Sequence, residues 1–144
     1  MTRGYFGIGV YQPKNSVNIG TLWRSAHNFG AAFIFTVGAR YKRQPGDTTA
    51  AWKTIPLFEY TSMEDCLERP RDCFIVAVEQ CDGAGDLRNF AHPDRVMYLL
   101  GAEDRGVPSD VLKQCQRIVQ IDTPMCLNVA VAGSIVMYDR AAKA

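Results

Sequence analysis

Residues 96–112 read VMYLLGAEDRGVPSDVL, and this stretch decides the fold class. An uninterrupted apolar run, Val96–Leu100, leads into a turn that contains two glycines, and a short helical pattern, Asp110–Cys115, follows the turn. A strand that is apolar at every position is buried on both faces, which is typical of a parallel sheet covered by helices. We therefore expect an α/β fold.

The same alternation of apolar runs and helical patterns extends over the whole chain. The apolar runs predict strands at Tyr5–Val10, Ala32–Val37, Cys73–Glu79, Val96–Leu100 and Arg117–Ile121. Helical patterns lie at Ile19–Phe29, Ser62–Leu67, Asp110–Cys115 and Leu127–Ala142. No repeat or linker interrupts them, so we expect one domain over residues 1–144, with a single parallel sheet and helices on both faces.

The charge of the chain is near zero overall but unevenly distributed. The 144 residues are 47% hydrophobic and 22% charged, which excludes a disordered or collagen-like chain. The net charge of +1 argues by itself against a nucleic-acid partner. Residues 1–60, however, hold seven Lys and Arg against two acidic residues, whereas residues 61–144 hold nine against thirteen. This asymmetry indicates a basic face for an anionic partner, or else simple scatter of surface charge.

Cysteine usage indicates the compartment. The five cysteines include no C-x-x-C pair, so neither a disulfide framework nor a metal site is expected. No stretch has the apolar core of a signal peptide or the length of a membrane span. These observations predict a cytoplasmic protein that does not enter a membrane.

Ligands of parallel sheets bind outside the carboxyl ends of the strands, which directs attention to the turns after the predicted strands. After the first strand, we expect Asn18 to cap a helix, Val17 to pack on Leu22, and Gly30 to end the helix. Arg24 then points away from the apolar helix face. A guanidinium at this place suits a phosphate or a developing oxyanion; the alternative is a solvated surface arginine.

Two further turns carry unusual residues. Gly101 and Gly106 allow a sharp turn close to a ligand, with Ser109 as the expected cap of the next helix; an ordinary turn is the alternative. After the last strand, Asn128 begins a helix that is apolar nearly all round up to Tyr138. Such a helix must be buried on every side, either by a partner subunit or as a central helix of a monomer.

The three turns together resemble one family. The motifs N-x-G-x-x-x-R (Asn18, Gly20, Arg24), G-x-E-x-x-G (Gly101, Glu103, Gly106) and P-M-C-L-N-V (Pro124–Val129) occur in the order seen in the SpoU (TrmH-like) branch of the SPOUT RNA methyltransferases. The resemblance spans nearly the whole chain. It implies an α/β fold with a C-terminal trefoil knot, and a homodimer.

The resemblance also implies a cofactor and a reaction. S-adenosylmethionine would donate a methyl group to a ribose 2′-hydroxyl of RNA. The implied cofactor-binding residues are Val78, Glu79, Gly101, Glu103, Gly106, Ile121, Pro124, Met125 and Leu127. The implied catalytic residues are Arg24, Asn18 and Asn128, with Arg24 offered to the cofactor of the partner subunit. Because arginine remains protonated, we expect Arg24 to stabilise the developing alkoxide rather than to act as a base.

The chain departs from the family at the third motif. Cys126 stands where the family usually has serine, and the loop from Ile121 to Leu127 is shorter than in many relatives. A thiol is a weaker hydrogen-bonding group than a hydroxyl, so a family role of that serine is in doubt here. Cofactor contacts in the shortened loop are expected to be rearranged.

A basic segment follows the second strand. Arg40, Lys42, Arg43 and Lys53 surround two aromatic residues there, which suits RNA phosphates and a stacked base; a solvated loop is the alternative. The minimal build resembles small tRNA ribose methyltransferases, such as the type acting at the wobble position. We therefore expect tRNA as the substrate. Ribosomal RNA, or a non-catalytic RNA- or nucleotide-binding module of the same fold, remain alternatives.

Overall fold

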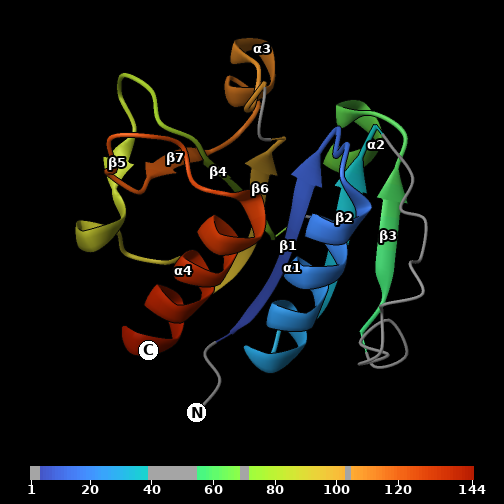
Figure 1. Cartoon of the computed structure of the whole chain (residues 1–144), viewed down its shortest axis with the longest axis horizontal. Coiled ribbons are helices and arrows are strands. Elements are labelled where there is room, and N and C mark those ends of the chain that lie inside the picture. The colour runs from blue at the N-terminus through green and yellow to red at the C-terminus, as the bar shows by residue number, and fades with distance from the viewer. Residues whose placement is uncertain (1–3, 39–54, 69–71, 103–104) are drawn as a thin grey trace.

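The computed structural model describes residues 4–38, 55–68, 72–102 and 105–144 (Figure 1). In chain order the elements are β1 (Tyr5–Tyr11), α1 (Ser16–Asn28), β2 (Phe33–Val37), β3 (Leu57–Tyr60), α2 (Met63–Leu67), β4 (Phe74–Val78), β5 (Gly85–Asp86), a 3₁₀-helix (Leu87–Asn89), β6 (Arg95–Gly101), α3 (Ser109–Leu112), β7 (Arg117–Gln120) and α4 (Val129–Ala142). Within this described part, no helix is long and apolar enough to cross a membrane.

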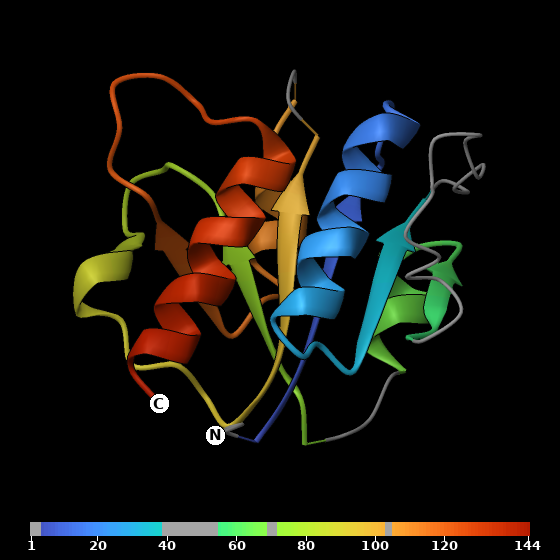
Figure 2. The same ribbon diagram turned by 60° about the horizontal axis from the view of Figure 1, so that its bottom comes forward.

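The strands form one seven-stranded sheet in the order β3-β2-β1-β6-β4-β7-β5. All strand pairings recorded among the described residues are parallel. Helices α1 and α4 pack their buried side chains into one core cluster, and α2 and α3 contribute to a second cluster on the other face. Figure 2 shows α1 and α4 side by side in front of the sheet. The expected parallel α/β sheet with helices on both faces is confirmed.

Strand β1 shows how the two faces are filled. Ile8 points into the core cluster under α1 and α4 and is fully buried. Gly7 and Gly9 point to the opposite face, where the rings of Phe33 and Phe35 lie so close that an added Cβ would overlap them. The aromatic side chains of β2 therefore occupy the space that β1 leaves empty, and β1 requires glycine at both positions.

Helices α1 and α4 run in the same direction from the carboxyl edge of the sheet. Near their starts, the side-chain amide of Asn128 donates to Asn18 Oδ1 at 3.0 Å. Further along, Ser134 Oγ donates to Ser25 Oγ at 3.0 Å. These two contacts, about two turns apart, keep the helices aligned and place both N-termini at the same edge.

The start of α1 differs from the sequence prediction. Asn15, in an extended conformation, is the N-cap, and its side chain accepts from the Val17 N–H at 2.9 Å. The predicted cap Asn18 is wrong, because it lies inside the helix; Val17 is also inside it and 63% exposed, so it does not staple the helix entry. Gly30, with φ +79°, ends the helix as expected.

Other element boundaries also differ. The sequence did not predict strands β3 and β5, which lie at the two edges of the sheet. Strand β3 is half exposed and β5 has only two residues, so neither forms an apolar run in the sequence. Helix α3 begins at Ser109, with Pro108 at the cap position and no side-chain cap bond, so the predicted cap at Ser109 is wrong. Helix α4 begins at Val129, and Asn128 caps it.

Helix α4 is not buried on every side within one chain. Val136 and Met137 are buried against the sheet and α1, whereas Val131, Ile135 and Tyr138 are 48%, 38% and 65% exposed. The alternative of a central helix enclosed in a monomer therefore fails. One apolar stripe of α4 faces outward.

A buried polar network ties the end of α4 to the sheet. Tyr98 Oη lies 2.6 Å from His92 Nδ1, and His92 Nε2 lies 2.6 Å from Asp139 Oδ2. Arg140 donates to Tyr98 Oη at 3.2 Å, and Lys143 lies 2.8 Å from Asp139. A neutral His92 fits, accepting from Tyr98 and donating to Asp139. The network anchors the last turn of α4 on β6.

We expect this network to make stability dependent on pH. Burial lowers the pKa of His92, an effect that Asp139 opposes and the charges of Lys143 and Arg140 reinforce. Protonation is thus more favourable in the unfolded chain, so the contribution is complete above about pH 6.5 and is lost as the pH falls below it. The free energy of unfolding should fall by up to about 1.4 kcal/mol per pH unit through this group.

Urea unfolding between pH 7 and 5 measures this dependence. His92→Gln should flatten the profile, while His27→Gln, at an exposed position on α1, serves as the control. If the free energy of unfolding changes equally with pH in the unmodified chain and in His92→Gln, His92 is not the source of the pH dependence.

Candidate active site

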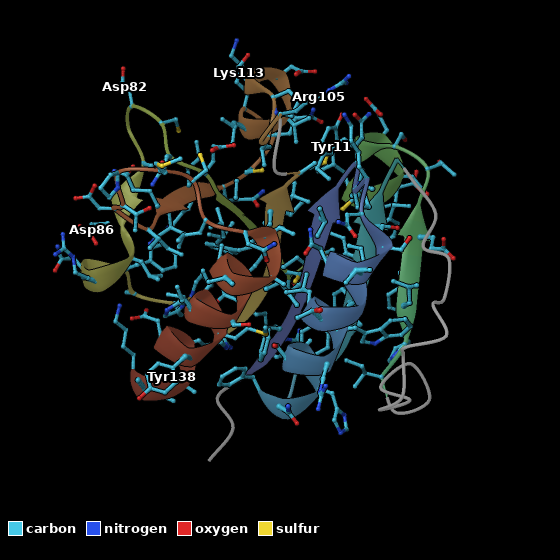
Figure 3. The ribbon with its side chains drawn as sticks, viewed as in Figure 1. Tyr11, Asp82, Asp86, Arg105, Lys113 and Tyr138 are labelled. Atoms are coloured by element: carbon cyan, nitrogen blue, oxygen red, sulfur yellow. The ribbon has the colours of Figure 1, made fainter. Side chains whose placement is uncertain are left out.

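A cleft of about 460 Å³ opens at the carboxyl ends of β4, β6 and β7. Its walls come from residues 78–81 after β4, from residues 100–102 and 105–112 around the end of β6, and from residues 121–132 after β7. The described residues that line it are Val78, Glu79, Gln80, Cys81, Leu100, Gly101, Ala102, Arg105, Gly106, Val107, Ser109, Leu112, Ile121, Thr123, Cys126, Leu127, Val129 and Ala132. Figure 3 shows Arg105 at this edge, close to α3. The volume falls in the range of small-molecule sites.

Glu79 holds the turn that follows β6. Gly106 adopts φ +64° and donates its N–H to Ala102 O at 2.8 Å, which closes the turn. Glu79 Oε2 accepts from the Val107 N–H at 2.7 Å. Glycine suits the positive φ of residue 106, and an added Cβ there would push the Glu79 carboxylate out of its present position. The end of β4 and the turn after β6 are thereby joined.

Gln80 holds the segment that follows β7. Its side-chain amide donates to Ile121 O at 2.8 Å and to Thr123 O at 3.0 Å. Thr123 Oγ1 donates in turn to Met125 O at 2.7 Å. Figure 2 shows this segment arching over the carboxyl edge from β7 to α4. Consecutive residues at the end of β4 therefore fix two different walls of the cleft.

The two predicted catalytic asparagines meet beside the cleft. In addition to the bond between their side chains, Asn128 Oδ1 accepts from the N–H groups of Ala130 at 2.9 Å and Val131 at 3.2 Å. A second hollow of about 150 Å³ is lined by Asn18 and shares Ala102 and Val129 with the main cleft. The asparagine pair thus joins the starts of α1 and α4 next to the cleft.

Arg24 is exposed and lines neither the cleft nor the second hollow. It lies one turn after Thr21 on α1, and residues three apart in a helix are neighbours. Thr21 borders an apolar groove of about 430 Å³ whose other wall is α4, including Val131, Ile135 and Tyr138. The structure therefore places Arg24 beside the exposed face of α1 and α4, apart from the cleft of its own chain.

Most of the predicted cofactor-binding residues converge on the cleft. Its lining includes Val78, Glu79, Gly101, Gly106, Ile121 and Leu127. Pro124 and Met125 belong to the same segment but do not line the cleft, and Met125 is 80% exposed. Glu103 and the basic residues Arg40, Lys42, Arg43 and Lys53 lie outside the described residues.

The sequence prediction missed several cleft residues, among them the polar residues Gln80, Arg105, Ser109 and Thr123. The signal for Gln80 was its place directly after the predicted strand Cys73–Glu79. No sequence pattern indicated that this glutamine reaches a segment some 40 residues away, because side chain-to-backbone bonds of this kind have no fixed spacing.

Two cysteines also line the cleft. Burial raises the pKa of the Cys81 thiol, and the negative charges of Glu79 and Asp82 raise it further, so this thiol stays protonated at neutral pH. The exposed Cys126 thiol lies 3.8 Å from Gln80 Oε1 as a donor. Among the residues that the structure describes, no group of three or more His, Cys, Asp and Glu side chains is placed to hold a metal ion.

One relative matches most of the sequence. The chain is 27% identical over 134 residues to a mouse protein, tRNA (guanosine(18)-2'-O)-methyltransferase TARBP1, an alignment that covers 85% of this chain and 8% of that protein. The chain therefore spans a small part of that relative's length.

Solved structures superpose over nearly the whole chain. An AdoMet-bound rRNA methyltransferase from Sinorhizobium meliloti matches with a TM-score of 0.86 and 22% identity, covering 99% of this chain and 57% of that one. The A. aeolicus TrmH/SpoU tRNA modifying enzyme gives 0.86 and 18%, covering 99% and 76%. A structure from work on 2-OH methylation of C/U34 on tRNA gives 0.82 and 23%, covering 96% and 95%.

The model of one family covers nearly the entire sequence. The SpoU rRNA Methylase family matches residues 6–138, which include β1 from its second residue, the cleft and most of α4. Both the order of the motifs and the fold that carries them agree with this match. The chain belongs to the SpoU rRNA Methylase family.

Proposed function

We propose that this protein is an S-adenosylmethionine-dependent RNA methyltransferase that modifies a ribose 2′-hydroxyl, with tRNA as its substrate. The observation that carries the proposal is the cleft of about 460 Å³ at the carboxyl edge, built from positions that match the family motifs and flanked by the Asn18–Asn128 pair. Membership of the SpoU family supports the reaction class.

The residues of the cleft fit the proposed cofactor. Leu100, Ile121 and Leu127 supply apolar walls for an adenine ring, and backbone groups at the ends of β4 and β6 supply hydrogen-bond partners. Glu79 contributes a carboxylate, already used by Val107 N–H, on the same wall. S-adenosylmethionine, when bound, supplies an activated methyl group on a positively charged sulfur. The protein then has to orient the acceptor hydroxyl and help it to lose its proton.

Arg24 acts in a shared site in this proposal. It lies one helical turn after Thr21, which borders the apolar groove between α1 and α4, and a second copy of the chain would cover the exposed stripe of α4 in this groove. In a homodimer built on that face, Arg24 of one protomer approaches the cleft of its partner. There the permanently charged guanidinium binds RNA phosphate and stabilises the developing alkoxide, and the Asn18–Asn128 pair orders the starts of both helices.

We further propose the family's trefoil knot, a single methyltransferase domain over residues 1–144, and a cytoplasmic location. The family and the shared fold support the knot, because the SpoU family matches residues 6–138 and the A. aeolicus TrmH/SpoU enzyme superposes on nearly the whole chain. The cysteines are present as thiols, which suits a reducing compartment; they are Cys66, Cys73, Cys81, Cys115 and Cys126.

Transfer of a tritiated methyl group to bulk tRNA and to ribosomal RNA tests the proposal. Incorporation into tRNA, at a nucleotide whose 3′ linkage becomes resistant to nucleases, is the expected result. Incorporation into ribosomal RNA alone would replace tRNA as the substrate. Tight cofactor binding without any transfer would identify a non-catalytic module, the reading that the replacement of the family serine by Cys126 favours.

Replacing Arg24 should separate chemistry from cofactor binding. Arg24→Ala is expected to lower kcat by about 10²–10³-fold, because one donor to the developing charge is lost. Cofactor affinity, measured by calorimetry, should change less than about twofold, since Arg24 does not line its own cleft. Arg95→Ala, at the amino edge of β6 and paired with Asp72, is the matched control. Equal loss of transfer and cofactor affinity would refute the assignment.

The exposed stripe of α4 should hold two copies together. Light scattering after size exclusion should give a mass near twice the 16.0 kDa of one chain. Ile135→Asp buries a charge in the proposed interface and should shift the protein to a monomer that transfers no methyl groups. Phe74→Asp, exposed at the start of β4, should leave the dimer intact. A monomeric parent chain with full activity would exclude the shared site.

The basic segment after β2 should carry part of the RNA affinity. Replacing Arg40, Lys42 and Arg43 together by glutamine removes three charges and should reduce the slope of log K against log salt by about 2. Filter binding at several salt concentrations measures this slope. An unchanged slope would show that these residues do not neutralise phosphates.

A further inference from the structure

The side chain of Gln80 makes contacts that no other described side chain in the cleft duplicates. Its amide nitrogen lies 2.8 Å from Ile121 O, 3.0 Å from Thr123 O and 3.0 Å from Thr123 Oγ1. Its own oxygen lies 3.8 Å from the Cys126 thiol. One half-buried side chain at the end of β4 therefore contacts the segment after β7 at three residues.

The chemistry of these contacts specifies a carboxamide. Ile121 and Thr123 offer backbone carbonyl oxygens, which only accept hydrogen bonds, so the Gln80 group facing them must be the –NH₂. A glutamate at neutral pH has no donor and would oppose its charge to those oxygens. A methionine would fill the same volume without any donor. The geometry therefore distinguishes glutamine from its closest replacements.

The neighbouring bonds extend the same restraint along the loop. Thr123 Oγ1, which lies next to the Gln80 amide, donates to Met125 O at 2.7 Å. Cys126 closes the series through its thiol on Gln80 Oε1. Cys126, which stands where the family usually has serine, is thus hydrogen-bonded to Gln80 and lines the cleft.

The loop held in this way forms one wall of the cleft. Ile121, Thr123, Cys126 and Leu127 all line it, opposite the turn that Glu79 holds. If the loop moved outward, the cleft would lose this wall, and with it the apolar surface and backbone groups available to a ligand. Ligand affinity should therefore depend on how firmly the loop is held.

We propose that Gln80 is a positioning residue for the methyl donor. Its carboxamide keeps the segment 121–126 in the conformation that binds S-adenosylmethionine, and Cys126 is the last residue of this segment that is hydrogen-bonded to Gln80. This inference rests on the proposed function. Gln80 acts through the loop, and its substitution should raise the Kd and KM for the cofactor much more than it lowers kcat.

Binding of S-adenosylhomocysteine by calorimetry, combined with hydrogen exchange of the peptide 121–127, tests the inference on the whole chain. Gln80→Met and Gln80→Glu should each raise Kd about tenfold or more and increase exchange in this peptide. Thr123→Val should give a smaller change in the same direction. Cys126→Ala should weaken binding in the parent chain but have no further effect beside Gln80→Met, since the two residues are coupled.

Gln116→Met is the matched control, because Gln116 also joins two segments, accepting from the Ile75 N–H at 2.6 Å, but at the amino end of β4. It should leave Kd and the exchange of peptide 121–127 within about twofold of the parent chain. A Gln80→Met variant that binds and exchanges like the parent would overturn the inference. If the parent chain itself binds no cofactor, the proposed function fails, and hydrogen exchange still decides whether Gln80 holds the loop.

Discussion

Strand β6 occupies the centre of the sheet, and the rest of the structure depends on its complete burial. It pairs with β1 on one side and β4 on the other, and Val96–Leu100 are at most 2% exposed. Its side chains alternate between the two cores, so both helical layers pack on it. Burial also forces the Tyr98 hydroxyl to find partners, which it does in His92 and Arg140. The same strand thus positions α4 and, at its carboxyl end, the cleft.

Two adjacent residues that follow β4 hold two different segments of the cleft. Glu79 fixes the turn after β6 through its carboxylate, and Gln80 fixes the segment after β7 through its amide. Glu79 accepts from a backbone N–H, whereas Gln80 donates to backbone carbonyl oxygens. A carboxylate has no donor, so a glutamate could not make the bonds of Gln80. These two side chains therefore hold two walls of the cleft in place.

Apolar runs predicted the fold class, because they report burial directly. The six expected positions that line the cleft came from the resemblance to the SpoU family, and two of them, Gly101 and Gly106, also from the turn that they allow. The sequence did not predict strand β3, whose half-exposed residues resemble a loop, or the cap at Asn15, which competes with Asn18 for the same pattern. The reach of Gln80 across the sheet edge depends on tertiary packing alone. The exposed position of Arg24, by contrast, agrees with the helical pattern, which predicted that this side chain points away from the apolar face of α1.

The common direction of α1 and α4 has an electrostatic consequence. The peptide dipoles of a helix sum to about half a positive charge at its N-terminus. Asn15 and Asn128 cap the two helices at the same edge of the sheet, so the two fields add there. A chain with a net charge of +1 can therefore present a positive potential to a polyanion without a matching excess of Lys and Arg. Because backbone dipoles do not titrate, that part of the attraction persists at any pH at which the helices remain folded.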